Sequence, residues 1–131
     1  MSESQRNNRS LVEELVVLGT YDWVRPADVL SLTEDFEADN YPLRRTMSFG
    51  AIAEVVVAGL MIPGSVPDRT FVPWDTSEGD SIAAIVRQWL SEWGKDFPNL
   101  DFDICLKNTA DGTELALSVI TREDAESEQP S

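Results

Sequence analysis

The segment FGAIAEVVVAGLMI, residues 49–62, decides the fold, because a helical pattern ends within it and a strand pattern follows. Apolar side chains recur at intervals of three and four, which predicts a helix from about Thr46 to Ala58 that stops at Gly59. Residues 60–62 and 70–74 are short and β-leaning, and the loop between them is rich in proline and glycine. We therefore predict a small β-hairpin directly after this helix.

Two further helices are predicted on the amino-terminal side of this segment. Ser10 and Glu13 have the spacing of a capping box, and the apolar stripe that follows predicts a helix that stops at Gly19. Pro26 suits the first turn of a second helix, over about 26–34. Residues 39–42, with Asp, Asn and Pro, are interpreted as a turn.

On the carboxy-terminal side, we predict one more helix and a second hairpin. Six apolar residues from Ile82 to Trp93 are spaced as one helix face, after a capping-box pattern at 77–80 and before a stop at Gly94. Residues 101–107 and 115–120 alternate like strands around Asp-Gly. The expected fold class is thus α+β: a single domain over 10–120, with flexible tails at 1–9 and 121–131, the second disordered and acidic.

The order of helix, helix, helix, strand, loop and strand over residues 10–74 resembles the layout of a winged-helix domain. The segments GLMIPGS at 59–65 and FVPWD at 71–75, Trp89 in its helix, and DIC at 103–105 also look like a set of small uncharacterised bacterial proteins. This second resemblance covers most of the chain. It implies a shared fold and carries over no site residue.

Composition excludes several kinds of chemistry. The 131 residues include 10 Lys and Arg against 24 Asp and Glu, giving a net charge of −14, and there is no His. Catalysis through His and His-ligated zinc are therefore excluded, and a single cysteine, Cys105, cannot form an internal disulfide. With no secretion signal or membrane-length apolar run, we expect a cytoplasmic protein.

The aspartates are the remaining candidates for catalytic residues. Asp101 and Asp103 share a predicted strand face and, with Asp75 or Asp80, could hold a metal or act as acid and base. Alternating Asp on an amphipathic strand is more simply its solvated face. We therefore predict no catalytic, cofactor or metal site, and a protein that is not an enzyme.

Binding to another protein is the function that the sequence favours. High acidity speeds association with a basic partner, as an immunity or inhibitor protein of a basic toxin would require. Trp89 and Trp93 belong to the helix stripe and are expected in the core. Trp23 and Trp74 lie in loop or strand-end contexts, where an aromatic ring either covers the core or anchors a partner. They are the candidate partner-binding residues.

The alternative is a winged-helix transcriptional regulator that binds nucleic acid. Residues 40–74 carry a net charge of +1, from Arg44, Arg45 and Arg69 against two acids, while the remainder of the chain is strongly acidic. These three arginines are the candidate nucleic-acid contacts. They form a thin footprint, because specific DNA-binding proteins often neutralise about 6–10 phosphates.

Overall fold

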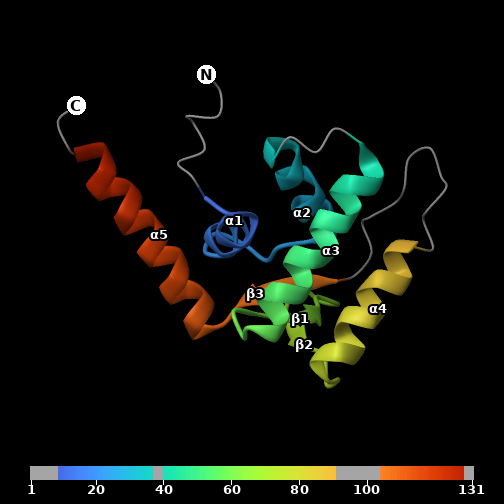
Figure 1. Ribbon diagram of the computed structural model, residues 1–131. Coiled ribbons are helices and arrows are strands. Elements are labelled where there is room, and N and C mark those ends of the chain that lie inside the picture. Colours follow the sequence, from blue (N-terminus) through green and yellow to red (C-terminus); the bar gives the residue numbers. More distant parts are fainter. Residues whose placement is uncertain (1–8, 37–39, 91–103, 129–131) are drawn as a thin grey trace.

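The computed structural model describes residues 9–36, 40–90 and 104–128, which form five α-helices, a short 3-10 helix and one antiparallel sheet (Figure 1). The predicted α+β fold class is confirmed. The helices are α1 (Leu11–Leu18), α2 (Pro26–Leu32), η2 (Thr33–Phe36), α3 (Tyr41–Val57), α4 (Glu78–Leu90) and α5 (Ala110–Glu128). The strands are β1 (Met61–Ser65), β2 (Val72–Pro73) and β3 (Cys105–Asn108).

The amino-terminal part has the predicted order of three helices and a hairpin, and its helix starts follow from side-chain caps. The Glu13 N–H donates to Ser10 Oγ at 3.1 Å and the Ser10 N–H to the Glu13 carboxylate at 2.9 Å, which confirms the capping box. The third helix begins five residues earlier than predicted. Asn40 Oδ1 accepts the Leu43 N–H at 2.8 Å, so Asn40, which was predicted to lie in a turn, is the N-cap of α3.

The sheet has the strand order β2-β1-β3, and both pairs are antiparallel. Because Met61 pairs with Asn108 and Pro63 with Leu106, alternate residues of β1 face the helices, and Met61 and Leu106 are buried. The chain before α2 adds one bridge at the far side of β3, where Val24 exchanges two backbone hydrogen bonds with Leu106. In Figure 1, α5 lies to the left of the sheet and α4 to its right.

The second hairpin predicted at the carboxy-terminal end is wrong. β3 pairs with β1 of the first hairpin, and the predicted strand 115–120 is part of α5. Asp-Gly is not a turn between strands but lies in the first turn of α5, where the Gly112 N–H donates to Thr109 Oγ1 at 3.1 Å. Gly112 also lies directly against the Leu60 carbonyl oxygen, where a Cβ would clash. The site needs a glycine for close approach rather than for a turn.

The predicted flexible tail from residue 121 is also corrected, because α5 continues to Glu128. Its later turns are joined to the start of α1 by ion pairs. The Arg9 guanidinium donates to both oxygens of Glu123, at 2.6 and 2.7 Å, and to Glu14 at 2.9 Å. These hydrogen bonds from Arg9 lower the pKa of the Glu123 carboxyl. Charge pairing thus supplies contacts that the apolar pattern of this segment did not indicate. Residues 1–8 and 129–131 of the two predicted tails lie outside the described residues.

The hydrophobic core lies between the sheet and helices α1, α2, α3 and α4, with a contribution from α5. Trp89 of α4 is fully buried, as predicted; Trp93 lies outside the described residues. The Trp89 ring meets Phe49 of α3 edge-on, with 5.0 Å between the ring centroids, and its Nε1–H donates to the Tyr41 hydroxyl at 2.6 Å. This contact fixes α4 against α3. No helix in the described ranges has the length and apolarity needed to cross a membrane.

Candidate partner-binding surface

Trp74 follows the edge strand β2 and is held in place by β1. Its backbone N–H donates to the Pro63 carbonyl at 3.1 Å, and its indole Nε1–H donates to Ser65 Oγ at 2.9 Å. The ring is half-buried and packs against the edge of the core. Since both the backbone and the indole N–H are fixed, the ring presents a preorganised apolar face.

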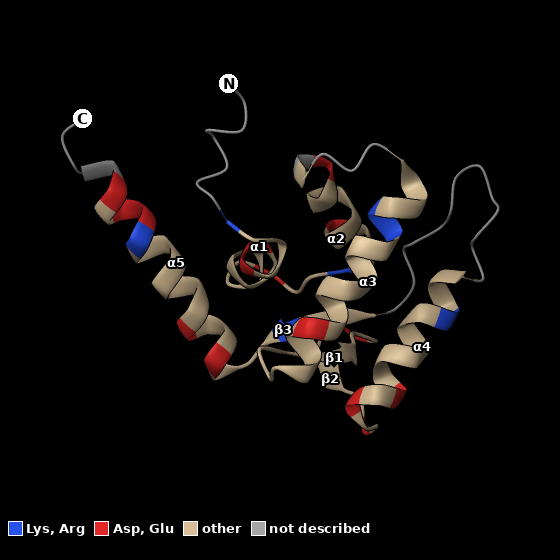
Figure 2. Ribbon diagram, in the orientation of Figure 1, with Lys and Arg blue, Asp and Glu red and all other residues tan. Residues whose placement is uncertain are grey.

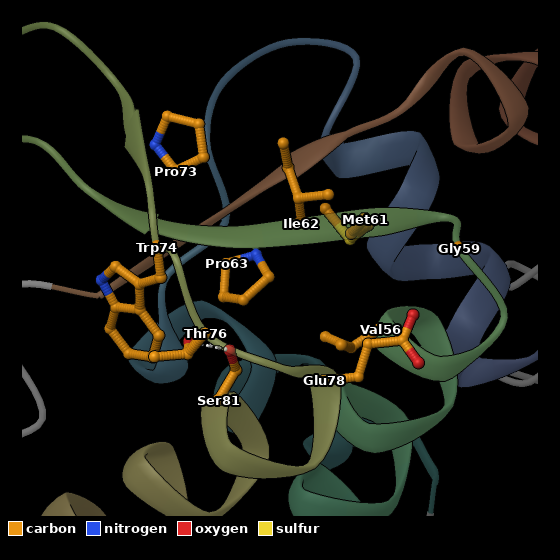
Figure 3. A pocket seen from close by; sticks show the side chains of 10 residues that line it. All are labelled: Val56, Gly59, Met61, Ile62, Pro63, Pro73, Trp74, Thr76, Glu78 and Ser81. Atoms are coloured by element: carbon orange, nitrogen blue, oxygen red, sulfur yellow. Dashed lines mark hydrogen bonds between the residues drawn. The ribbon is translucent and has the colours of Figure 1, made fainter.

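A pocket of about 170 Å³ opens on one side of Trp74, between the hairpin, the end of α3 and the start of α4 (Figure 3). Most of its wall is apolar, with Thr76, Glu78 and Ser81 as the polar side chains. The complete lining is Val56, Gly59, Met61, Ile62, Pro63, Pro73, Trp74, Thr76, Glu78 and Ser81.

The two hydroxyl groups of this pocket form a hydrogen bond with each other, whereas its carboxylate forms no ion pair with a described residue. Thr76 Oγ1 and Ser81 Oγ lie 2.6 Å apart and share a hydrogen bond, and Ser81 is buried. Glu78, in the first turn of α4, is exposed, and no described cation forms an ion pair with it. Glu78 is therefore the group in this wall that sets the charge of an incoming ligand.

A second, shallower hollow of about 450 Å³ also borders Trp74 and is lined by Trp74, Asp75, Thr76, Asp80, Ala84 and Arg87. Between Arg69 and Arg87 the sequence contains three acids and no base. All three acids, Asp75, Glu78 and Asp80, are exposed, and the start of α4 is acidic in Figure 2. We call Trp74, these three acids and the two hollows the Trp74 surface.

Trp23, the other candidate partner-binding residue, does not belong to this surface. Side chains alternate along the strands, so Trp74 shares a sheet face with Pro63, and Phe71 lies on the other face with Gly64. The half-buried Trp23 ring lies against Phe71, with 6.2 Å between the ring centroids, and Lys107 Nζ lies 5.6 Å from the Phe71 centroid. The two tryptophans therefore lie on opposite faces of the sheet.

The three arginines that are candidate nucleic-acid contacts have different surroundings and do not form one basic patch. The Arg44 guanidinium donates to the Leu30 carbonyl and to Thr33 Oγ1, both at 3.0 Å, and also pairs with a Glu34 oxygen at 3.2 Å. It therefore joins the carboxy-terminal end of α2 to the first turn of α3. The Arg45 guanidinium lies 5.9 Å from the centroid of Phe49 on the same helix. Arg69 is exposed in the β1–β2 loop, which follows the other end of α3.

The described part of the chain shows no cluster of three or more Cys, Asp or Glu side chains placed to bind a metal ion. Asp101 and Asp103, the acids considered for such a role, lie outside the described residues. Cys105 is buried in β3 and lies on the sheet face that carries Phe71.

Comparison with protein-family models, with curated proteins and with solved structures finds no match to this chain. The Trp74 surface is therefore defined by its own geometry. Sequence reasoning singled out Trp74, but it considered Asp75 and Asp80 only as metal ligands or as acid and base, and it missed Glu78. The signal that could have found them is the run without a base from residue 70 to 86, which surrounds an aromatic ring at a strand end.

Proposed function

We propose that this chain is a non-enzymatic interaction module whose Trp74 surface binds a basic segment of another protein. The observation that carries the proposal is a fixed, half-buried Trp that lines two hollows, beside three exposed carboxylates and one exposed base, Arg87. Tryptophan is enriched among the residues that dominate binding energy at interfaces. Asp75, Glu78 and Asp80 favour a partner of opposite charge.

The size of the pocket favours a protein partner over a metabolite. Pockets that enclose drug-sized ligands usually measure about 300–1,000 Å³ and surround most of the ligand. The pocket beside Trp74 measures about 170 Å³, and the larger hollow is shallower and more open. Such a surface suits one inserted side chain with flatter contacts around it, as at a protein interface.

The partner is expected to bind through side chains rather than as an added strand. β2 is the edge of the sheet next to the Trp74 surface, and it has only two residues. Its second residue, Pro73, has no N–H to donate to a neighbouring strand. A short strand that contains proline is a known protection of a sheet edge against pairing.

The overall charge adds long-range attraction to the same partner. A net charge of −14 speeds encounter with a basic protein, and an immunity or inhibitor protein of a basic toxin is one concrete form of this function. Binding to nucleic acid stays a prediction of the sequence. No specific contact favours it, because Arg44 is engaged with α2 and the Trp74 surface carries three acids against one base, Arg87.

Site-specific photo-cross-linking in the cells that make this chain tests the proposal. A photoreactive benzoylphenylalanine replaces Ala84, which lines the shallow hollow, or Leu117, which is 56% exposed on α5, as the matched control. We expect the probe at position 84 to form an adduct whose linked peptide is rich in Lys or Arg, and the probe at 117 not to form it. The adduct should also disappear when Trp74→Ala is added. Equal adducts from both positions, or none from position 84, would refute the proposed function.

A further inference from the structure

We infer that the pocket beside Trp74 accepts a single basic side chain of the partner, lysine or arginine, with the aliphatic stem inside and the cation at Glu78. This inference rests on the proposed function and names the group that the surface selects. Three properties of the pocket lead to it: its volume, the composition of its wall and the position of its carboxylate.

The volume limits the occupant to one side chain. An apolar cavity of about 150 Å³ holds a molecule the size of benzene, and this pocket measures about 170 Å³. A helix face or a folded ligand is too large for that space. The four-carbon stem of lysine, or the three-carbon stem of arginine with its guanidinium at Glu78, matches it in size.

The wall favours an aliphatic stem over a fully polar ligand. Val56, Met61 and Pro63 form an apolar part of the wall, and the Thr76 and Ser81 hydroxyls already bond to each other. A strongly hydrated ligand would lose water against this apolar part of the wall, which offers no hydrogen bonds in exchange. Lysine and arginine side chains avoid this cost, because they bury the stem on apolar surface and leave the charged end in water or at a carboxylate.

Glu78 supplies the carboxylate that a purely apolar occupant would not need. Its side chain borders the pocket on the side opposite to Trp74 in Figure 3, and it forms no ion pair with any described residue. A stem that enters past Trp74 therefore ends at a negative charge. A charge-assisted hydrogen bond at that point distinguishes a basic side chain from leucine or norleucine of similar length.

Capped single amino acids test the inference without a known partner. The probes are the N-acetyl methylamides of arginine, lysine, norleucine and glutamate, added to the full chain while the methyl NMR signals of Val56, Met61 and Ile62 are recorded. We expect the two basic probes to shift these signals with a dissociation constant on the order of 1 mM, as their small size allows. Norleucine should bind several-fold more weakly, and glutamate should not bind. The arginine and lysine titrations also determine which cation the pocket prefers.

Glu78→Gln is the critical variant, and Glu114→Gln, at an exposed position of α5, is its control. We expect Glu78→Gln to weaken the binding of the arginine and lysine probes about fivefold or more and to leave the binding of norleucine unchanged. Glu114→Gln should change the affinity for none of these probes. Norleucine binding as tightly as arginine, or no shift with any probe, would overturn the inference. A partner whose cross-link still depended on Trp74 would then leave the proposed function standing. Conversely, basic probes that bind while no partner cross-links would support the pocket chemistry and refute the proposed function.

Discussion

Replacement of Trp89 by alanine is expected to lower the free energy of unfolding by about 3–5 kcal/mol, which is a large part of the stability of a typical domain. The ring is fully buried, meets Phe49 edge-on and donates its N–H to Tyr41. Alanine leaves a cavity between α4 and α3 and removes the hydrogen bond. Because the first turn of α4 carries Glu78 and Asp80, loss of this contact should make the position of these two acids in the Trp74 surface less fixed.

Urea unfolding followed by circular dichroism measures this loss as a lower midpoint at an unchanged slope. Leu90→Ala is the control on the same helix, because Leu90 is 43% exposed and its truncation should cost less than about 1 kcal/mol. If Trp89→Ala were as mild as Leu90→Ala, α4 would not be anchored to α3 through this ring, and the described position of the pocket wall would be wrong.

Trp74→Ala is expected to weaken binding of the cross-linked partner at least about 30-fold while the fold is retained. The half-buried ring lines both hollows and is held by Ser65, so its removal takes away part of the wall of each. Isothermal titration with the purified partner measures the change, and circular dichroism verifies folding.

Trp23→Ala is the matched control for this variant. It removes the same ring from a half-buried position on the opposite face of the sheet, beside Phe71. We expect its affinity for the partner to stay within about threefold of wild type, since Trp23 lies outside the interface and distant sites are usually independent. Similar losses in both tryptophan variants would show that general destabilisation, and not the Trp74 surface, controls binding.

Local signals in the sequence were sufficient for much of the fold. The Ser10 and Glu13 capping box, the stripe that buries Ile85 and Trp89, and the change of period at Gly59 each depend on neighbours a few residues away. They predicted α1, α4 and the first hairpin. The start of α3 was missed because Asn40 serves equally well as a turn residue and as a helix cap.

The carboxy-terminal error has a different cause. Leu115, Leu117 and Val119 alternate like a strand, but Leu115 and Val119 are also one helical turn apart. In α5 the small Ala116 is fully buried while Leu117 is 56% exposed, so hydrophobicity along the chain did not indicate which face was inside. β3 pairs with β1, more than 40 residues earlier in the chain, and not with residues 115–120. This long-range pairing leaves no local signal in the sequence.

The candidate surface was only partly predictable, because its residues also come together through long-range packing. Trp74 was identifiable as an aromatic residue at a strand end. The joining of Glu78 with Val56 and Met61 in one pocket depends on how α4 packs beside α3, through Trp89. Strand pairing places Trp23 and Trp74 on opposite faces of the sheet, which their loop and strand-end contexts in the sequence did not indicate.

The affinity of the partner for two charge-matched variants tests the central claim most directly. One variant carries Asp75→Asn, Glu78→Gln and Asp80→Asn; the other carries Gln at Glu54, Glu114 and Glu126, which are exposed elsewhere. Both variants remove the same net charge. At about 0.15 M salt, where distant charges are largely screened, the first should lose affinity on the order of 100-fold and the second no more than about threefold. Equal losses would show that the partner responds to overall acidity and would contradict a binding site at Trp74.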